Sequence, residues 1–328
     1  EGRIVPVAGD LAKPGLGVEG LDEPIDHLFH LAAIYDLDAD EAAMHRANVE
    51  GTRHVIEFAN AHEVGRFHHV SSIAVAGGYQ GLFREDMFDE GQPLPHAYHA
   101  TKFASEKLVR EELSSKLLVF RPGLVIGHSE TGEMDKIDGP YYFFKLIQRL
   151  RHALPSWFPL IGPEGRKAWL VPVDFVARAM DHIAHLPEQE LPGDTFHLVD
   201  PSPPTIGQAL NEFARAAHAP QLAARLDRKL VQGLVPKPVA KGLLQVPTVR
   251  RARETVLRDL GIPPAAWENR EFRCDFDARD TQRALRGTGI AIPPLSSYAT
   301  RLWDYWERNL DPDLFRERSL SASIAGKR

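Results

Sequence analysis

A tyrosine and a lysine stand four residues apart in the stretch "HAYHATKFASEKL". On a helix, Tyr98 and Lys102 would lie one turn apart on the same face. A free tyrosine has a pKa of about 10, which is too high for efficient proton transfer at neutral pH. A neighbouring ammonium stabilises the phenolate and lowers that pKa. The spacing therefore indicates a candidate proton-transfer centre.

A hydroxyl group from a neighbouring strand end would complete such a centre. Ser71 and Ser72 close the apolar segment "RFHHVSS", and strand ends that lead into loops carry the sites of open parallel sheets. Either hydroxyl could hold a substrate carbonyl beside Tyr98. The Tyr98–Lys102 spacing alone also fits an ordinary surface helix, but the serine pair and the later "VFRPG" favour catalysis.

Short apolar runs alternate with amphipathic stretches through the first half of the chain. This alternation predicts an α/β fold with a doubly wound parallel sheet, covered by helices on both faces. Strands are expected at 3–9, 27–33, 66–75, 116–123, 168–175 and 194–200. Helices are expected at 39–62, 96–114, 205–219, 223–260, 277–286 and 297–309.

This pattern predicts three regions. Residues 1–204 form a Rossmann-like nucleotide-binding domain, with an excursion at 130–165 that belongs to a substrate lobe. Residues 205–310 form that smaller, mostly helical substrate lobe. Residues 311–328 are polar with little periodicity, and we expect a linker or tail.

The composition excludes several classes of protein. The 328 residues carry a net charge of −6, which gives no reason to expect a nucleic-acid partner. The single cysteine, Cys274, excludes an intrachain disulfide and a cysteine-based zinc site, and it fits a reducing compartment. No apolar run reaches the length of a membrane span, and no signal-peptide pattern opens the sequence. We expect a cytoplasmic protein.

Fifteen histidines raise the question of a metal site. His27 and His30 are three apart on a predicted strand, so they point to opposite faces and cannot chelate together. His182 and His185 lack a carboxylate–histidine signature around them. We expect structural roles for the histidines and no metal.

A set of motifs resembles the extended short-chain dehydrogenase/reductases. The matching segments, in the family's order, are "VAGDL", "HLFHLAA", "NVEGT", "HHVSSIAVAG", "YHATK", "FRPGLVIG" and "VPVDFVA". The resemblance implies an NAD(P)-binding Rossmann fold. It also implies a catalytic serine at Ser72, an acid/base at Tyr98, and an electrostatic partner and ribose ligand at Lys102.

Further roles follow from the same resemblance. Asp10 and Leu11 would contact the adenine, Ala32 and Ala33 would line the cofactor channel, and Asn48 would lie near the active site. Pro122 and the backbone near Val125 would meet the nicotinamide.

A narrower resemblance covers nearly the whole chain. The segments "FREDMFDEG", "GPYYFFKLIQ" and "WDYWERNLDPDLF" look like the N-terminal reductase half of Marinobacter-type bacterial fatty acyl-CoA reductases. This implies reduction of a long-chain acyl-CoA or fatty aldehyde with NADPH. It also implies a second reductase domain after this one in a longer protein.

The first βαβ unit of the expected fold is missing. "VAGDLAKPGLG" has glycines, but it follows a predicted strand without leading into an apolar helical pattern. The chain therefore reads as a segment that starts partway into its fold. We expect the segment alone to bind NADPH poorly and to be inactive.

Residues 225–258 are rich in lysine and arginine around apolar runs. They are expected to form a helical lid over the active site. A second interpretation is a mouth for acyl chains, where basic residues meet CoA phosphates or a membrane surface.

Two other functions remain open at this stage. The same fold serves sugar-nucleotide epimerases or dehydratases and hydroxysteroid-type dehydrogenases, although the apolar lobe disfavours a polar substrate. A non-catalytic interaction module is favoured by the missing glycine turn and disfavoured by the intact Ser72, Tyr98 and Lys102.

Overall fold

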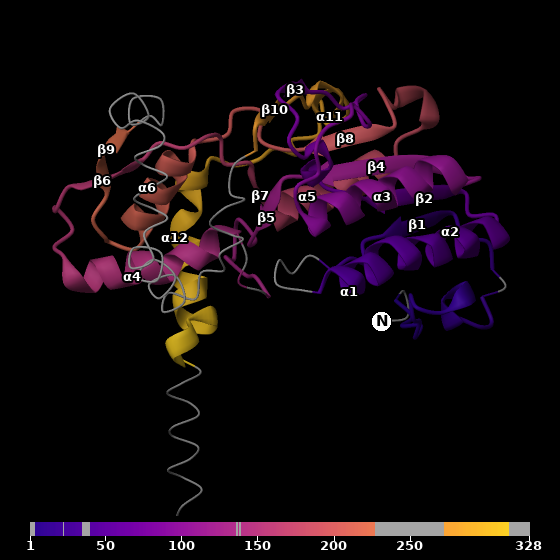
Figure 1. The fold of residues 1–328 in the computed structure, drawn as a ribbon, viewed down its shortest axis with the longest axis horizontal. Helices are drawn as coiled ribbons and strands as arrows, with labels where there is room; N and C mark the ends of the chain where they lie inside the picture. Colours follow the sequence, from indigo (N-terminus) through magenta and orange to yellow (C-terminus); the bar gives the residue numbers. More distant parts are fainter. Residues whose placement is uncertain are drawn as a thin grey trace, which may run out of the picture. The chain divides into compact units, whose positions relative to one another are not determined.

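The computed structural model describes residues 4–21, 23–34, 40–135, 137, 139–226 and 272–314. Within this part of the chain there are two compact units (Figure 1). The first unit contains the residues up to 123 together with 176–201 and 272–290. The second contains 124–175, 202–226 and 291–314.

The first unit is built on a four-stranded parallel sheet in the order β1–β2–β4–β8 (Figure 1). The strands are β1 (His27–His30), β2 (Arg66–Val70), β4 (Lys116–Pro122) and β8 (Thr195–Leu198). Each of the last three is buried along most of its length, as strands covered on both faces should be. The sequence had predicted all four.

Helices cover both faces of this sheet. On one face, α2 (Gly51–Ala61) and α3 (Ala97–Glu112) pack against Phe67 of β2, in a cluster of fully buried apolar side chains. On the other face, His185 follows α5 (Val173–Ala184), and its ring lies 4.8 Å from that of His27. The predicted doubly wound Rossmann-like architecture is confirmed.

The helix predicted over 39–62 is present but not regular. It consists of α1 (Glu41–His45), a π-helical turn η2 (Arg46–Glu50) and α2. The first turn is capped by Asp40, whose side chain accepts a hydrogen bond from the Ala43 amide.

The strand expected at 3–9 is wrong within the described residues 4–9, which have no regular structure. Ile4 and Val5 are 90% and 76% exposed. A strand is stable only when a neighbour satisfies its backbone groups and covers its apolar side chains. Among the described residues no strand pairs with this segment.

A small parallel pair was not predicted. β3 (Gly81–Phe83) pairs with β10 (Cys274–Phe276), which leads into α11 (Arg279–Ala284). The buried Glu85 fixes this helix, since its carboxylate accepts hydrogen bonds from the backbone amides of Asp280 and Thr281. The segment expected as a helix of the lobe at 277–286 therefore packs in the first unit.

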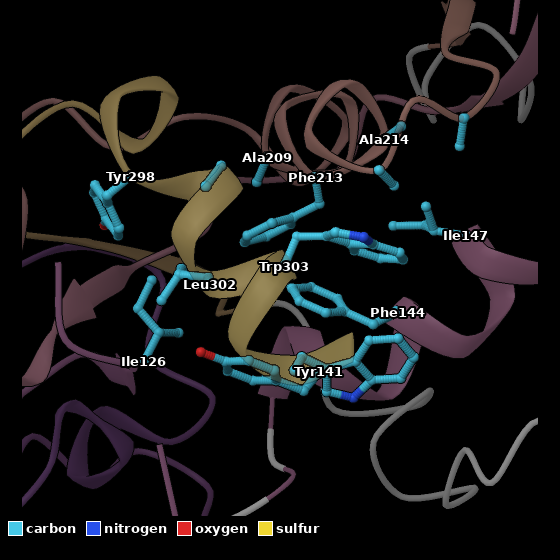
Figure 2. Close-up of a cluster of buried hydrophobic side chains, with 14 of the residues drawn as sticks. Ile126, Tyr141, Phe144, Ile147, Ala209, Phe213, Ala214, Tyr298, Leu302 and Trp303 are labelled. Carbon is cyan, nitrogen blue, oxygen red and sulfur yellow. The ribbon is translucent and has the colours of Figure 1, made fainter. Parts of the chain in front are cut away.

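The second unit is mostly helical. It contains α4 (Phe144–Ala153), α6 (Ile206–Ala216) and α12 (Ala299–Tyr305), followed by the π-helical turn η7 (Trp306–Leu310). Figure 2 shows their shared core, in which the Phe144 ring lies 4.8 Å from that of Phe213 and 5.1 Å from that of Trp303. Two parallel strand pairs complete the unit: β5 (Leu124–Ile126) with β7 (Leu170–Pro172), and β6 (Leu160–Pro163) with β9 (Leu222–Leu226).

These boundaries differ from the expected ones in two places. The excursion into the second unit covers 124–175, wider than the predicted 130–165, because β5 and β7 pair with each other. β9 occupies the start of the stretch predicted as helical from 223. The rest of the basic segment 225–258, and the tail beyond residue 314, lie outside the described residues.

The described residues contain neither a membrane-spanning helix nor a metal-binding cluster. None of the helices described is long and apolar enough to cross a membrane. No group of three or more potential ligands in this part of the chain could hold a metal ion. The opposite orientation of His27 and His30 is confirmed, since His27 stacks on His68 and His30 lies beside His69.

Buried histidines of the first unit predict destabilisation by acid. Burial lowers the pKa of His30 to about 4, and the pKa of His68 and of His197 to about 3. In the unfolded chain each has a pKa of about 6.5, so below that pH the unfolded state binds more protons. Their stabilisation is present above about pH 6.5 and is lost as the pH falls towards the folded values. Urea titrations should show a free energy of unfolding lower by several kcal/mol at about pH 5 than at about pH 7.5.

The variant His68→Phe isolates one of these groups. The His68 ring packs 4.2 Å from that of Phe29, so phenylalanine keeps this aromatic contact, while the contact of His68 Nε2 with His27 Nδ1 at 2.8 Å is lost. The dependence of the unfolding free energy on pH should become shallower by about 1.4 kcal/mol per pH unit below about pH 6. An unchanged slope would contradict this account of the buried ring.

Candidate active site

α3 carries the predicted proton-transfer pair. The helix begins directly after His96, whose backbone is extended, and it places Tyr98 and Lys102 one turn apart. Tyr98 is half-buried, whereas Lys102 is 5% exposed. The same face continues with Glu106 and Arg110 at the same spacing. A tyrosine at the start of the helix is thus followed by a line of charged groups.

The Lys102 amine is held against the end of β2. Its Nζ donates a hydrogen bond to the Val70 carbonyl at 2.7 Å. Burial lowers the pKa of Lys102 to about 8, and the carboxylate of Glu106 acts in the opposite direction. The amine therefore remains mostly protonated at neutral pH, and a cation in this place favours the phenolate form of a nearby tyrosine.

The structure distinguishes the two serines at the end of β2. The Ser71 hydroxyl is buried and donates to Oε2 of Glu106 at 2.6 Å. Ser72 is half-buried and caps the 3₁₀ turn η3 (Ile73–Ala76), where its Oγ accepts from the Ala74 amide at 3.1 Å. Because Ser72 Oγ acts as an acceptor in this contact, its hydroxyl proton can still be donated to another group. Of the two, Ser72 is the one that can hold a substrate oxygen.

Asn48 clamps the loop that follows β1. From the π-helical turn η2 its side chain accepts from the Ile34 amide at 2.7 Å and donates to the Ile34 carbonyl at 2.8 Å. It also donates to Thr101 Oγ1 on α3 at 3.2 Å. Asn48 is 2% exposed, so it connects this loop to the helix of Tyr98 from the interior. Single π-helical turns within α-helices are frequent at functional sites.

The predicted cofactor residues occupy several places. Asp10 is exposed, and its Oδ1 accepts from the Ala12 amide at 2.9 Å. Leu11 is half-buried, and its carbonyl contacts His54 Nδ1 at 2.7 Å. Ala32 and Ala33 lie in the loop after β1 that Asn48 clamps.

The remaining two cofactor candidates belong to different units. Pro122 is buried at the end of β4 in the first unit, while Val125 lies in β5 of the second. The structure thus brings Ser72, Tyr98, Lys102, Asn48 and Pro122 into one unit.

A glycine-rich sequence precedes these elements. Residues 15–20, "GLGVEG", have the G-x-G-x-x-G spacing, which binds phosphates when it joins a strand to a helix. Here the segment forms the 3₁₀ turn η1 (Pro14–Gly17), and Gly15, Leu16 and Gly17 have left-handed φ values of 59°, 59° and 61°. Within the described residues no helix follows it before β1. It therefore does not provide the helix N-terminus that a pyrophosphate needs.

One part of the site was missed by the sequence analysis. Glu106, Arg121, Arg110 and Ser71 form a fully or largely buried network between α3, β2 and β4. The signal was present, since Glu106 follows Lys102 by four residues and Arg121 stands in "FRPG".

Fold and site together define a class of protein. A doubly wound parallel sheet, with a serine after β2 and a tyrosine and a lysine in the first half of α3, matches the NAD(P)-dependent reductases of the extended short-chain dehydrogenase/reductase type. The family model described as "Male sterility protein", an NAD-binding domain, matches residues 1–180. The chain belongs to this family.

Solved structures of similar chains support the fold. The terminal R domain from the myxalamid PKS-NRPS biosynthetic pathway is 27% identical, with a TM-score of 0.68, covering 93% of this chain and 75% of that one. RMD from Pseudomonas aeruginosa, complexed with NADPH, is 17% identical with a TM-score of 0.58, covering 93% of this chain and 90% of that one. The second similarity shows the fold alone.

Two curated relatives are much longer proteins. The nonribosomal peptide synthetase FrzA of Cladobotryum sp is 27% identical over 93% of this chain and 30% of its own length. The aldehyde reductase lnaA of Aspergillus flavus is 26% identical over 90% of this chain and 29% of its own length. The chain thus spans less than a third of these relatives. They support the broad reductase family and do not single out the Marinobacter-type fatty acyl-CoA reductases.

Removing the Asn48 clamp should loosen the loop after β1. In Asn48→Ala the amide and carbonyl of Ile34 lose their side-chain partner, so the free energy of unfolding should fall by about 2 kcal/mol. Exchange of the Ile34 amide hydrogen should accelerate by about tenfold or more, since the loop opens more easily. Urea titration and hydrogen exchange measure these two effects.

Asn60→Ala is the matched control. Asn60 also clamps a backbone, since it donates to the Glu112 carbonyl at 3.0 Å and accepts from the Ser114 amide at 2.9 Å. It lies away from the loop after β1, so this variant should leave exchange at Ile34 unchanged. Equal acceleration in both variants would show that Asn48 acts only through general stability.

Proposed function

We propose that this chain reduces an acyl thioester, or the aldehyde derived from it, by hydride transfer from NADPH. The observation that carries the proposal is the tie between α3 and the end of β2. The Lys102 amine reaches the Val70 carbonyl, two residues before Ser72, and Tyr98 precedes Lys102 by one helical turn. A buried cation held at the end of β2, next to residues that the family resemblance implies are catalytic, supports the proposal.

The described residues fit the nicotinamide end of the cofactor better than its phosphate end. Lys102 offers a cation at the carboxyl end of the sheet, and Pro122 closes the neighbouring strand. When bound, the reduced nicotinamide supplies the hydride that adds to the substrate carbonyl carbon. The choice of NADPH over NADH rests on the sequence resemblance.

The chain's own residues handle the carbonyl oxygen. The hydroxyls of Ser72 and Tyr98 would donate hydrogen bonds to it and stabilise the negative charge that develops there. Tyr98 would then transfer its proton to that oxygen, and the Lys102 ammonium would stabilise the phenolate left behind. With a thioester, the resulting hemithioacetal breaks its carbon–sulfur bond, releasing a thiol and an aldehyde. With an aldehyde, the same steps give an alcohol.

The substrate class is the finer part of the proposal. The chain's own resemblance favours a long-chain fatty acyl-CoA or fatty aldehyde. The comparison names peptide synthetases and aldehyde reductases, and a solved relative is a thiolation-reductase di-domain, 18% identical with a TM-score of 0.65. An acyl group bound through a thioester is common to peptide synthetases and to the thiolation-reductase di-domain. A further domain in the parent protein, next to this one, fits the length of the relatives.

Reduction should depend on the tyrosine hydroxyl. With the full-length protein, NADPH oxidation would be followed by absorbance with a long-chain acyl-CoA, a fatty aldehyde and an acyl-pantetheine thioester. Tyr98→Phe should lower kcat by about a hundredfold or more, because the proton donor is removed. Tyr79→Phe, at a half-buried tyrosine on the segment before β3, should leave kcat near the wild-type value.

Other outcomes of these activity and binding measurements would favour a different function. NADPH binding without oxidation by any of the three substrates would favour the epimerase, dehydratase or hydroxysteroid dehydrogenase alternatives. Full activity in Tyr98→Phe would overturn the assigned acid. No cofactor binding by the full-length protein would favour a non-catalytic interaction module.

A further inference from the structure

Four side chains follow one another at every fourth position on a single face of α3. They are Tyr98, Lys102, Glu106 and Arg110, and this face lies against the sheet. The first two belong to the proposed reductase site. The third, Glu106, is 0% exposed. A fully buried carboxylate is costly unless paired and hydrogen-bonded, so its partners show what holds it there.

Both carboxylate oxygens of Glu106 are fully used. Oε2 accepts from Ser71 Oγ at 2.6 Å and from Arg121 Nε at 3.1 Å. Oε1 accepts from Arg121 Nη2 at 2.5 Å, and from Nε and Nη2 of Arg110 at 3.1 and 2.9 Å. One buried anion thus joins one hydroxyl and two guanidinium groups.

These partners stand at the strand ends that form the site. Ser71 immediately precedes Ser72, and its backbone amide donates to the Phe120 carbonyl at 2.8 Å. Arg121 immediately precedes Pro122, and its Nη1 donates to the Met87 carbonyl at 2.8 Å. Arg121 Nη1 also lies 3.2 Å from His197 Nε2 on β8. Glu106 therefore fixes the ends of β2 and β4 relative to the helix of Tyr98.

Charges around Lys102 make Glu106 important for a second reason. From the sheet, Lys102 is approached by His30 of β1 and His69 of β2, and burial lowers the pKa of His30 to about 4 and that of His69 well below its usual value. Both rings are therefore neutral near pH 7 and offer no negative charge. Arg110 and Arg121 are cations of the same network. Glu106 is the carboxylate that raises the pKa of Lys102.

We infer that Glu106 is a positioning residue of the reductase site, which holds the Ser71–Ser72 strand end against α3 and compensates the buried positive charge of Lys102. The inference rests on the proposed function, in which Ser72, Tyr98 and Lys102 act on the carbonyl. It assigns to Glu106 two separable tasks, one geometric and one electrostatic. Glu106 is 0% exposed, so it acts through the groups that it holds.

The two tasks predict different effects on the full-length enzyme. Removing a negative charge lowers the pKa of every nearby titrating group. In Glu106→Gln the alkaline limb of the pH profile of kcat/KM should therefore move down by about half a pH unit or more. Glu106→Asp keeps the charge, so the alkaline limb should stay at its wild-type pH. In this variant kcat should fall about tenfold, because the shorter side chain cannot hold both strand ends.

Ser71→Ala tests the geometric task alone. It removes the tie to the strand end and retains every charge, so kcat should fall about tenfold with an unchanged limb. Ser105→Ala is the matched control, because Ser105 is equally buried on α3 but donates only to the Lys102 carbonyl, within the helix. This control should keep wild-type kcat and the wild-type limb.

A substrate-independent measurement separates this inference from the proposed function. The titration of Lys102 can be followed by NMR of ¹⁵N-lysine protein, with the signal assigned through Lys102→Met. Its pKa should fall in Glu106→Gln and stay unchanged in Glu106→Asp. That result in a protein that reduces none of the three substrates would refute the proposed function and leave the charge compensation standing.

Other results would overturn the inference. A Glu106→Gln enzyme with lower stability but a wild-type limb and a wild-type Lys102 titration would mean a purely structural salt bridge. If Glu106→Gln does not fold, Ser71→Ala and Glu106→Asp still test the inference, because both variants keep every charge of the network. Wild-type kcat in both of these variants would overturn the inference.

Discussion

Parallel pairing is the constraint on which the candidate site depends. Because β1, β2 and β4 run in the same direction, the loops that follow them all leave the sheet at one edge. Only three residues separate the end of α3 from the start of β4, so the end of this helix lies at the opposite edge of the sheet and its first turn lies near the loops. Tyr98 in that first turn and Ser72 after β2 therefore lie at the same edge of the sheet, although they are 26 positions apart in the chain.

Polar groups inside the first unit are arranged around this edge. A protein interior tolerates a buried charge or amide only when its hydrogen bonds are satisfied. Asn48 meets this requirement through the backbone of Ile34, and Lys102 through the carbonyl of Val70. In each case the partner is an irregular or terminal piece of backbone that would otherwise need water. The same contacts that satisfy the side chains therefore fix the shape of the loops.

The sequence was sufficient for the local elements and for the chemistry of single residues. Alternation of apolar runs predicted β1, β2, β4 and β8, and the spacing of Tyr98 and Lys102 placed them correctly on one helix. The strand expected at 3–9 failed because periodicity records which side chains could be buried, and pairing requires a neighbour. The residues alone could not choose between Ser71 and Ser72. That distinction depends on Glu106, which reaches Ser71 from 35 residues away.

Local sequence patterns could not predict which strands pair when they are far apart in the chain. β3 and β10 are three-residue strands, too short for a clear alternation, and their partners are nearly two hundred residues apart in the chain. The same holds for the second unit, where α4, α6 and α12 each present an ordinary amphipathic face. Which faces meet is decided by the shapes of Phe144, Phe213 and Trp303 together.

The pairing of β3 with β10 also has a consequence for the way the protein is made. On a ribosome, the chain emerges from its N-terminus, and a strand cannot pair before its partner has been synthesised. The carboxylate of Glu85 accepts hydrogen bonds from the amides of Asp280 and Thr281, which follow it by 195 and 196 positions and are therefore synthesised much later. The first unit is therefore incomplete until residues 124–175 and 202–226 of the second unit have been synthesised. Throughout that interval Glu85 and the strand of Phe83 lack the partners that they have in the folded unit.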